Sequence, residues 1–261
     1  MGILNVTPDS FSDGGRYFDP ETALRRGLEM VDQGADVVDI GGESTRPGSD
    51  PVSAEEEWRR IRPVIQGLAA KADIPLSVDT MKPEVAAHAI DSGVSIVNDV
   101  SGMRDEAMVH LVAARRVGVV AMHMLGNPKT MQDHPTYADV VEEVRAFLAE
   151  RIRSLEAAGV SSDAIAIDPG VGFGKAVAHN LALLRRLDRL VDLGHPVVVG
   201  VSRKSFIGRF GGGEAGDRLA GSLAAATLAV ARGAQIVRVH DVAETVRAMR
   251  VADALALEEK L

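Results

Sequence analysis

Short apolar runs alternate with longer amphipathic stretches along the chain, and glycine marks many of the boundaries. Four segments share one pattern, in which glycine precedes a run rich in Val, Ile or Ala that ends at a polar residue. They are GADVVDI (34–40), GVSIVND (93–99), GVVAMH (118–123) and GAQIVRVH (233–240). Glycine ends a helix without a steric penalty, so each segment predicts a helix followed by a buried strand.

Four further apolar runs complete the set of predicted strands. They lie at the start of the chain, around Leu76 in PLSVDT, around Ile167 in AIAIDPG and around Val198 in PVVVGVS. The first strand begins at Met1 itself, which is compatible with a further segment upstream. Strands that are apolar on both faces are typical of a parallel sheet covered by helices.

Amphipathic stretches between the strands predict eight helices. Asp19 and Pro20 supply an N-cap and a first-turn proline for the first helix, and Ser53 with Glu56 predicts a capping box for the second. The other helices are expected at 83–91, 105–116, 138–158, 178–192, 215–232 and 242–258. This alternation predicts an α/β fold, a parallel (β/α)8 TIM barrel that forms a single domain over residues 1–261. A doubly wound open sheet is the alternative.

Composition narrows the possible partners. The chain carries 29 Lys and Arg residues against 37 Asp and Glu, and the net charge of -8 argues against a nucleic-acid or anionic-membrane surface. The absence of cysteine excludes disulfides, thiolate nucleophiles and cysteine-ligated metals. No apolar run approaches the ~18–20 residues of a membrane span, and no signal peptide opens the chain. We therefore expect a cytoplasmic protein.

Polar side chains follow every predicted strand, at the end of a barrel where active sites form. They are Asn5 and Thr7; Asp39, Glu43, Thr45 and Arg46; Asp79; Asn98 and Asp99; His123; Asp168; Ser202, Arg203 and Lys204; and Arg238, His240 and Asp241. Any one of them could serve only its own loop. Polar residues at all the strand ends instead favour a site for a polar ligand in the barrel mouth.

The residue types suggest what that ligand is. Asp79, Asn98 and Asp168 offer carboxylates and an amide that could pair with the polar edge of a planar heterocycle. Helix capping and loop bracing are the alternative for the two aspartates. Arg238 and His240 follow the last strand, where barrels commonly bind phosphate. Arg238 could otherwise pair simply with Asp241 or an outer acid.

Familiar catalytic motifs are missing from the sequence. DPGVGFGK (168–175) is glycine-rich but lacks the spacing of a nucleotide phosphate loop, and the chain contains neither HExxH nor GxSxG. These absences disfavour a nucleotide loop, a zinc protease and a hydrolase of the nucleophile-elbow type.

Taken together, the polar motifs resemble those of the dihydropteroate synthase family. They are MGILNVTPDSFSDGG at the start, then DIGGESTRPG, SVDT, NDVSG, MHM with GNPKTMQ, DPGVGFGK, GVSRKSFIG and RVHDV. The motifs occur in family order and cover nearly the whole chain. The resemblance implies a pterin-binding barrel that joins 6-hydroxymethyl-7,8-dihydropterin diphosphate to 4-aminobenzoate in folate biosynthesis. It also implies a transferase that is a sulfonamide target and a homodimer, with Mg2+ as cofactor.

The resemblance assigns roles residue by residue. It implies a pterin site made of Asp79, Asn98, Met122, Asp168, Lys204 and Arg238. It implies a diphosphate site made of Asn5, Arg238 and His240, with Asn5 as the metal ligand. The aminobenzoate site would comprise Phe11, Thr45, Arg46, Pro47, Phe173, Lys204 and Ser205. Lys204, Asp79, Arg238 and His240 form the expected catalytic set, and the first loop would be a lid over the barrel mouth.

Two other functions compete with this interpretation. A methyltetrahydrofolate-binding methyltransferase would share the acidic floor but would not need the STRPG and SRKS loops. An inactive barrel that serves as a binding protein would not need to keep Asn5, Arg46, Lys204, Arg238 and His240 together. The sequence therefore favours the synthase over both.

Overall fold

Parallel strands form the centre of the molecule, whose computed structural model describes residues 1–7, 19–46, 48–214 and 217–256. The strands are β1 (Gly2–Asn5), β2 (Val38–Gly41), β3 (Leu76–Asp79), β4 (Ile96–Asp99), β5 (Gly118–Met122), β6 (Ile165–Asp168), β7 (Val198–Val199) and β8 (Ile236–Val237). Strands β1 to β6 pair in chain order, and β7 pairs with β8. Parallel bridges between Gly2 and Val239 and between Ile167 and Val197 join the two sheets at both edges. The predicted closed barrel is confirmed, and the open sheet is wrong.

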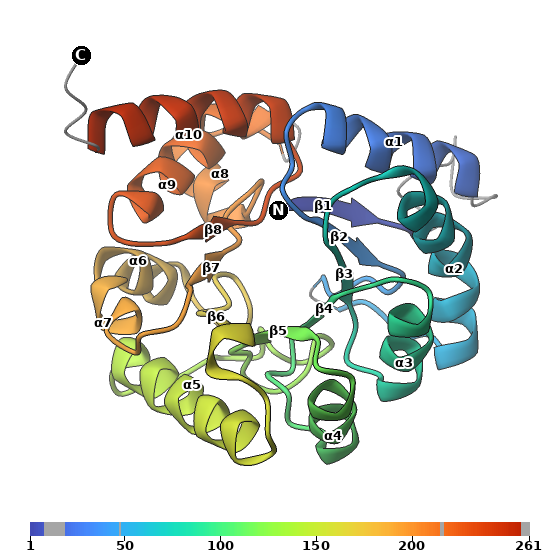
Figure 1. Ribbon diagram of the computed structural model, residues 1–261. Helices are drawn as coiled ribbons and strands as arrows, with labels where there is room; N and C mark the ends of the chain where they lie inside the picture. The colour runs from blue at the N-terminus through green and yellow to red at the C-terminus, as the bar shows by residue number, and fades with distance from the viewer. Residues whose placement is uncertain (8–18, 47, 215–216, 257–261) are drawn as a thin grey trace.

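Helices surround the strands as a ring (Figure 1). They are α1 (Pro20–Asp32), α2 (Ala54–Lys71), α3 (Pro83–Asp91), α4 (Glu106–Arg115), α5 (Val140–Ala157), α6 (Val177–Arg185), α7 (Asp188–Val191), α8 (Ser205–Gly211), α9 (Leu219–Val230) and α10 (Val242–Ala256). The last helix lies beside the first, so the ring closes where the chain begins (Figure 1). None of the described helices combines the length and the apolar character needed to cross a bilayer.

Two expected helices differ from the prediction. The helix expected at 178–192 is divided into α6 and α7, although the buried Leu183, Leu187 and Leu190 continue one apolar stripe across the break. The helix expected at 215–232 begins instead at Leu219, and the short α8 precedes it. Two glycines weaken the local helical signal of α8, whose Phe206 and Ile207 are buried in the core. Packing therefore supports a helix that local preference does not indicate.

The helix caps agree with the sequence in part. The carboxylate of Asp19 accepts hydrogen bonds from the backbone N–H groups of Glu21 and Thr22 at 3.1 and 3.2 Å. Ser53 Oγ accepts one from Glu56 N at 3.2 Å. The carboxylate of Glu56 binds Arg59 and Arg60 instead of returning to Ser53, so only half of the expected capping box forms.

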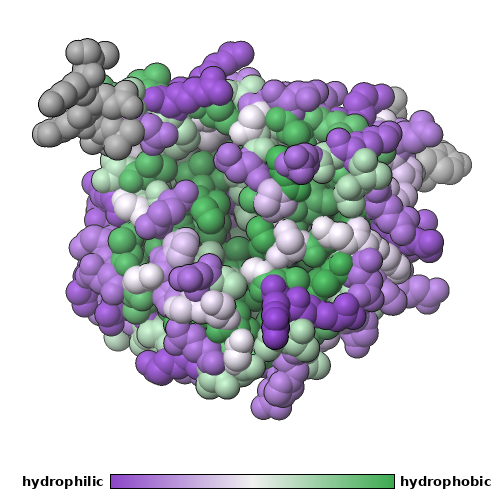
Figure 2. All heavy atoms as spheres, in the orientation of Figure 1, coloured by the Kyte–Doolittle hydropathy of each residue, from purple (hydrophilic) through white to green (hydrophobic). Residues whose placement is uncertain are grey.

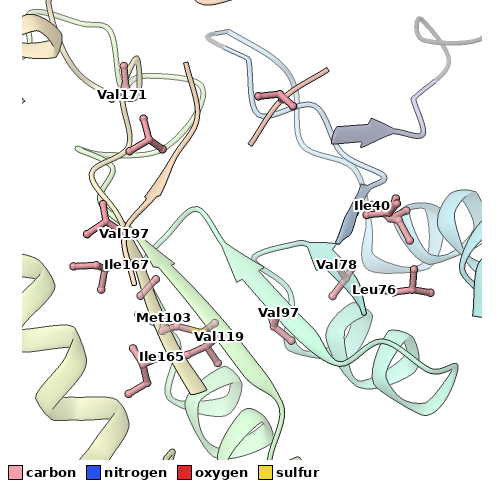
Figure 3. Close-up of a cluster of buried hydrophobic side chains, with 14 of the residues drawn as sticks. Ile40, Leu76, Val78, Val97, Met103, Val119, Ile165, Ile167, Val171 and Val197 are labelled. Atoms are coloured by element: carbon pink, nitrogen blue, oxygen red, sulfur yellow. The ribbon is translucent and has the colours of Figure 1, made fainter. Parts of the chain in front are cut away.

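The two faces of each strand have different roles. Ile40, Val78, Val97 and Val119 are in register across β2 to β5 and point away from the barrel interior, toward the helices (Figure 3). Successive side chains of a strand point to opposite faces, so the alternate positions line the interior. Figure 2 shows polar side chains around the rim of one face of the molecule and apolar ones toward its middle. The inward positions near the carboxyl ends of the strands are where the polar residues gather.

Candidate active site

A floor of acidic and amide groups lies inside the barrel, at the carboxyl ends of β2, β3, β4 and β6. Asp39 is fully buried, and Asp79, Asn98 and Asp168 are 8%, 4% and 5% exposed. The strand register places Asp79 beside Asn98. Asn98 Nδ2 donates a hydrogen bond to Asp39 Oδ2 at 3.0 Å. The structure therefore brings Asp79 and Asn98 of the predicted pterin site together and adds Asp39 to them.

Arg238 crosses the barrel from β8 and joins two of these carboxylates. Its Nε donates to Asp39 Oδ2 and its Nη2 donates to Asp79 Oδ2, each at 2.6 Å. Burial opposes the charge of Arg238, but the two carboxylates hold the pKa of the guanidinium above its ordinary value. The simple pairing of Arg238 with Asp241 is not what forms, because Asp241 instead binds Arg203 through Nε at 3.0 Å.

Two buried carboxylate oxygens of the floor lack hydrogen-bond donors among the described residues. Burial raises the pKa of Asp79 to about 7, although Arg238 opposes the shift. Within the described residues, the buried Oδ1 atoms of Asp39 and Asp79 have no hydrogen-bond partner. An unpaired buried acceptor is costly, so these oxygens favour a ligand that carries N–H groups into the barrel.

Asp168 both braces its loop and belongs to the floor. Its Oδ1 accepts a hydrogen bond from Gly170 N at 2.6 Å. Burial raises the pKa of this carboxyl, and the Gly170 N–H and the nearby Lys204 oppose the shift. The loop-bracing alternative is therefore confirmed for Asp168, and it is compatible with a ligand contact through the other carboxylate oxygen.

Lys204 reaches the site from the turn between β7 and α8. Its Nζ lies 4.2 Å from the centroid of the Phe173 ring, which is a cation–π contact. Burial lowers the pKa of Lys204 to about 8, and Arg238 contributes to the shift. The preceding Arg203 has a left-handed backbone with φ of 59°. Its N–H donates to Ser222 Oγ at 2.9 Å, which helps to hold the turn that directs Lys204.

His240 lies on the same side as Lys204, at the end of β8. Its Nδ1 lies 3.0 Å from Ser202 Oγ, and its backbone N–H donates to the same oxygen at 3.2 Å. Burial lowers the pKa of His240 to about 4, and the charges of Arg203 and Arg238 act in the same direction. The imidazole is therefore neutral near pH 7 in the protein without a ligand.

An apolar cluster lies close to the acidic floor. Val100, Met122, Met124 and Met131 are buried together, and Met81 and Phe173 pack against them. Met122 stands in register with Asp168 across β5 and β6, so the predicted ring contact borders the polar floor. The arrangement suits a flat ligand with one polar edge and an apolar face.

The predicted aminobenzoate residues are less tightly assembled. Thr45 is half-buried, whereas Arg46 and Ser205 are exposed. Phe11 and Pro47 lie outside the described residues, as does most of the expected lid. The loop that carries Thr45 is anchored by Glu43, which accepts a hydrogen bond from Val52 N at 3.2 Å and binds Lys82. Within this predicted set, Lys204 lies over the Phe173 ring, so these two residues are in contact.

The sequence placed Asp39 and His123 among the polar strand ends but gave neither a specific role, and it did not predict the buried pair of His123 and Lys175. Asp39 ends an apolar run in the same way as Asp79, and that similarity is the signal that could have identified it. Lys175 Nζ lies 2.9 Å from His123 Nδ1, and both side chains are buried. No local pattern indicates that pairing, because 52 positions separate the two residues.

Asn5 is the residue to which the family resemblance assigns Mg2+. It is half-buried at the end of β1 and in register with Gly41, at the same level of the barrel as Asp79. In the described part of the chain, no group of three or more His, Asp and Glu side chains could hold a metal ion. Mg2+ retains several waters and commonly shares phosphate oxygens with its ligand. One amide oxygen at the barrel mouth therefore fits a metal ion that arrives with a phosphate.

Comparisons with known proteins agree with this geometry. The model of the pterin binding enzyme family matches residues 1–240. The dihydropteroate synthase of Escherichia coli strain K12 is 46% identical over 254 residues, which cover 97% of this chain and 90% of that protein. The Xanthomonas albilineans dihydropteroate synthase structure with 4-aminobenzoic acid has a TM-score of 0.93 and 51% identity, and covers 99% of this chain and 93% of that one.

A second Xanthomonas albilineans structure, in complex with 7,8-dihydropteroate, has a TM-score of 0.89 and 47% identity over 99% of this chain and 93% of that one. Similarity of this extent covers both the barrel and the loops that carry the polar residues. The chain therefore belongs to the dihydropteroate synthase family of pterin-binding enzymes.

Proposed function

We propose that the protein condenses 6-hydroxymethyl-7,8-dihydropterin diphosphate with 4-aminobenzoate, forming 7,8-dihydropteroate and diphosphate in folate biosynthesis. The observation that carries this proposal is the buried acidic floor of Asp39, Asp79, Asn98 and Asp168, which meets the cationic Arg238 and Lys204 in one barrel mouth. Related proteins solved with 4-aminobenzoic acid and with 7,8-dihydropteroate support the choice of substrates.

The floor provides acceptors for the pterin. A pterin ring presents an amino group and ring N–H groups along one edge, and these match the carboxylates of Asp79 and Asp168. The Asn98 amide and the Lys204 ammonium add a further acceptor and a donor for the ring oxygen and nitrogens. Met122 would cover one ring face, and Arg238 would border the other. The buried oxygens of the floor would then gain the partners that they lack.

The cationic side receives the leaving group. The bridge between Gly2 and Val239 closes the barrel and brings the segment of Arg238 and His240 beside β1, the strand that carries Asn5, which supports a shared diphosphate site. The second edge of the Arg238 guanidinium and the His240 ring would bind diphosphate oxygens, which gives charge-assisted hydrogen bonds. Mg2+ held through Asn5 would supply further neutralisation of the diphosphate charge.

The chemistry requires little acid–base catalysis. The bond between the exocyclic carbon and the diphosphate oxygen breaks, and both electrons leave with the diphosphate. The carbon becomes cationic and shares its charge with the pterin ring, so an SN1-like path is expected. The neutral arylamine then forms the new C–N bond and loses one proton to solvent or diphosphate. Stabilising the leaving group and shielding the cation are therefore the main tasks of the protein.

The second substrate would lie between two loops. Phe173 and Lys204 would form one wall of its site, with Ser205 at the start of α8. The loop after β2, with Thr45, Arg46 and Pro47, and the first loop with Phe11 would form the other wall. Arg46 is exposed in the described structure, so its guanidinium is accessible to the carboxylate of 4-aminobenzoate.

A diphosphate-release assay tests the proposal. The purified protein with both substrates and Mg2+ should release diphosphate and form 7,8-dihydropteroate in equal amounts. Omission of 4-aminobenzoate should abolish the organic product. Diphosphate release at the same rate without 4-aminobenzoate would indicate a hydrolase and would contradict the proposal.

We further propose that the whole chain, 1–261, forms one domain of a cytoplasmic homodimer. The exposed Leu228, Val251 and Leu255 support an interface on α9 and α10, whose ribbons lie side by side (Figure 1). Leu255 is 83% exposed. Light scattering of Leu255→Glu beside the unaltered protein tests the dimer. A monomer in both samples would contradict it.

A further inference from the structure

The glycine-rich loop after β6 ends in a buried lysine that forms no ion pair within the described residues. Lys175 is 3% exposed. Its Nζ lies 2.9 Å from His123 Nδ1, 3.2 Å from His123 O and 2.9 Å from Phe173 O. In the tautomer of His123 that carries its proton on Nε2, the Nδ1 atom accepts, and these three acceptors use all three N–H groups of the protonated amine. A lysine engaged in this way has no N–H group left for a phosphate.

The neighbours of Lys175 maintain its unusual environment. Burial lowers the pKa of Lys175 to about 7, against the opposing charge of Asp168. Burial also lowers the pKa of His123 to about 3, and Lys175 and Arg104 act in the same direction. The His123 ring is neutral, and it packs edge-on against Phe147 with centroids 5.0 Å apart. Burying an amine costs desolvation free energy, so we expect its hydrogen bonds to serve the structure or the function of the site.

Those bonds connect two segments that border the site. His123 directly follows Met122 at the end of β5, and Phe173 is in the loop after β6. The Phe173 ring packs under Lys204 and against the methionine cluster. Strand β5 is paired with β4 on one side and β6 on the other, so its position does not depend on Lys175. The loop has no such ladder.

Close packing makes this loop sensitive to its tethers. Gly170 has φ of 66°, and a Cβ there would lie 1.9 Å from His123 O. Gly174 has φ of 62°, and a Cβ there would lie 2.7 Å from the Leu125 side chain. The backbone therefore lies directly against the end of β5. Besides Lys175, the Tyr137 hydroxyl donates to Gly174 O at 2.7 Å. One residue before Phe173, Gly172 O accepts from Gln132 Nε2 and Gly172 N donates to Asn180 Oδ1, each at 2.8 Å.

We propose that Lys175 is a positioning residue: by binding Phe173 O and His123 O together it fixes the Phe173 ring as a wall of the 4-aminobenzoate pocket. The inference rests on the proposed function and deepens it. Lys175 touches neither substrate in this role, and it acts only through Phe173. Removing it should therefore affect the second substrate more than the pterin, whose floor is set by the paired strands.

The test is steady-state kinetics of Lys175→Met, with each substrate varied in turn. Methionine preserves much of the apolar stem but leaves both carbonyls without a donor. The KM for 4-aminobenzoate should rise ~10-fold or more, while the KM for the pterin diphosphate changes less than about threefold. Lys71→Met, at the exposed end of α2, is the matched control and should change neither value.

A double mutant tests whether Lys175 acts through Phe173. The KM for 4-aminobenzoate of Lys175→Met/Phe173→Ala should be no higher than that of Phe173→Ala alone, because the ring that Lys175 positions is already gone. Additive increases would overturn the inference. Equal increases in both KM values, or no increase, would also overturn it and would leave Lys175 a purely structural residue.

A milder variant guards against failure to fold. Tyr137→Phe removes a single hydroxyl that holds the same loop. It should also raise the KM for 4-aminobenzoate more than the KM for the pterin diphosphate, by a smaller factor than Lys175→Met does. If Lys175→Met is insoluble, an unchanged ratio of the two KM values in Tyr137→Phe would overturn the inference. Wild-type protein that releases no diphosphate would overturn the proposed function and this inference together. If the wild-type protein is active and Lys175→Met raises both KM values equally, the inference is overturned and the proposed function stands.

Discussion

The acidic and the cationic sides of the barrel mouth are built in different ways. The acidic side comes from β2, β3, β4 and β6, which belong to one continuous parallel ladder. The cationic side comes from β7 and β8, which are two residues long, and from the turns that follow them. Asp39 and Asp79 are fixed by strand register, whereas Lys204 and His240 depend on side-chain contacts such as that between Ser202 and His240.

This difference assigns binding of the flat ring to the acidic side and binding of the diphosphate charge to the cationic side. The rigid side can offer a fixed set of acceptors to a flat ring, because the strand backbone sets their spacing. The turns on the other side can adjust to the diphosphate, which enters the site attached to the pterin and leaves it as a separate ion. Arg238 spans the division, since it belongs to the cationic side and binds Asp39 and Asp79 of the acidic side. The protein therefore neutralises part of its floor with the residue proposed to bind the leaving group.

Removing the residue that spans the division should have the largest effect. Arg238→Met leaves the buried carboxylates of Asp39 and Asp79 without their cation. The free energy of unfolding should fall by about 3–5 kcal/mol, and kcat/KM should fall ~10³-fold. Urea denaturation and diphosphate release measure the two effects.

A double mutant separates those two effects. Adding Asp39→Asn to Arg238→Met removes one uncompensated charge, so it should recover part of the stability and none of the activity. Wild-type stability in Arg238→Met would show that the ion pairs do not hold the two sides together.

Removing Lys204, which forms no ion pair with an acid among the described residues, should have a smaller effect. Lys204→Met should lower kcat/KM ~10²-fold, about the loss of one strong polar contact. Because the pKa of Lys204 is lowered to about 8 by burial and then by Arg238, the lysine loses its charge as pH rises above that value. The wild-type kcat/KM should therefore decline above pH 8, and this decline should be absent from the pH profile of Lys204→Met. An unchanged alkaline decline in the variant would assign it to another group.

The acidic side is tested by a substitution that preserves shape. Asp168→Asn keeps the volume but replaces one acceptor with a donor, so a non-reactive pterin should bind more weakly by ~1–3 kcal/mol. Isothermal titration calorimetry measures the difference. Asp188→Asn, on the exposed start of α7, should bind the pterin as tightly as the unaltered protein. Equal affinities for all three proteins would leave Asp168 with its loop-bracing role alone.

The smallest expected effect concerns protons on the cationic side. The pKa of His240 is lowered to about 4 by burial and then by Arg203 and Arg238, from an ordinary value of 6.5. A bound diphosphate should raise it again, so binding between pH 5 and 6 should take up close to one proton. Calorimetry in buffers of different ionisation enthalpy measures the uptake, which should disappear in His240→Asn. Equal uptake in the variant would exclude His240 as the acceptor.

The same histidine predicts a trend in stability. Its folded-state pKa lies below its unfolded value, so the unfolded chain binds more protons between pH 4 and 6.5. The contribution of the neutral His240 ring to the free energy of unfolding is fully present above pH 6.5 and is lost as the pH falls through 4. Compared with the unaltered protein, His240→Asn should therefore lose less stability across this range. A parallel pH dependence in the two proteins would contradict the shift.

The sequence by itself determined the order of the strands, most of the helices and the polar residues at the strand ends. Those features depend on local rules: apolar runs form buried strands, glycine ends helices, and side chains alternate along a strand. The prediction of Asp79, Asn98 and Asp168 at one floor needed only the additional rule that parallel strands end at one edge. Even the break between α6 and α7 left no trace in the pattern, because the apolar stripe of Leu183, Leu187 and Leu190 continues across it.

Tertiary structure alone decided which of these polar groups meet. Arg238 and Asp39 are 199 positions apart, and closure of β8 on β1 brings them into contact. Lys175 ends a glycine-rich segment that lacks the spacing of a phosphate loop and so has no predicted role in the sequence, and packing of its loop against β5 buries it beside two carbonyl oxygens. A local pattern states how each segment buries its own residues. The pairing of charges depends on the distances between segments, and only the closed barrel sets those distances.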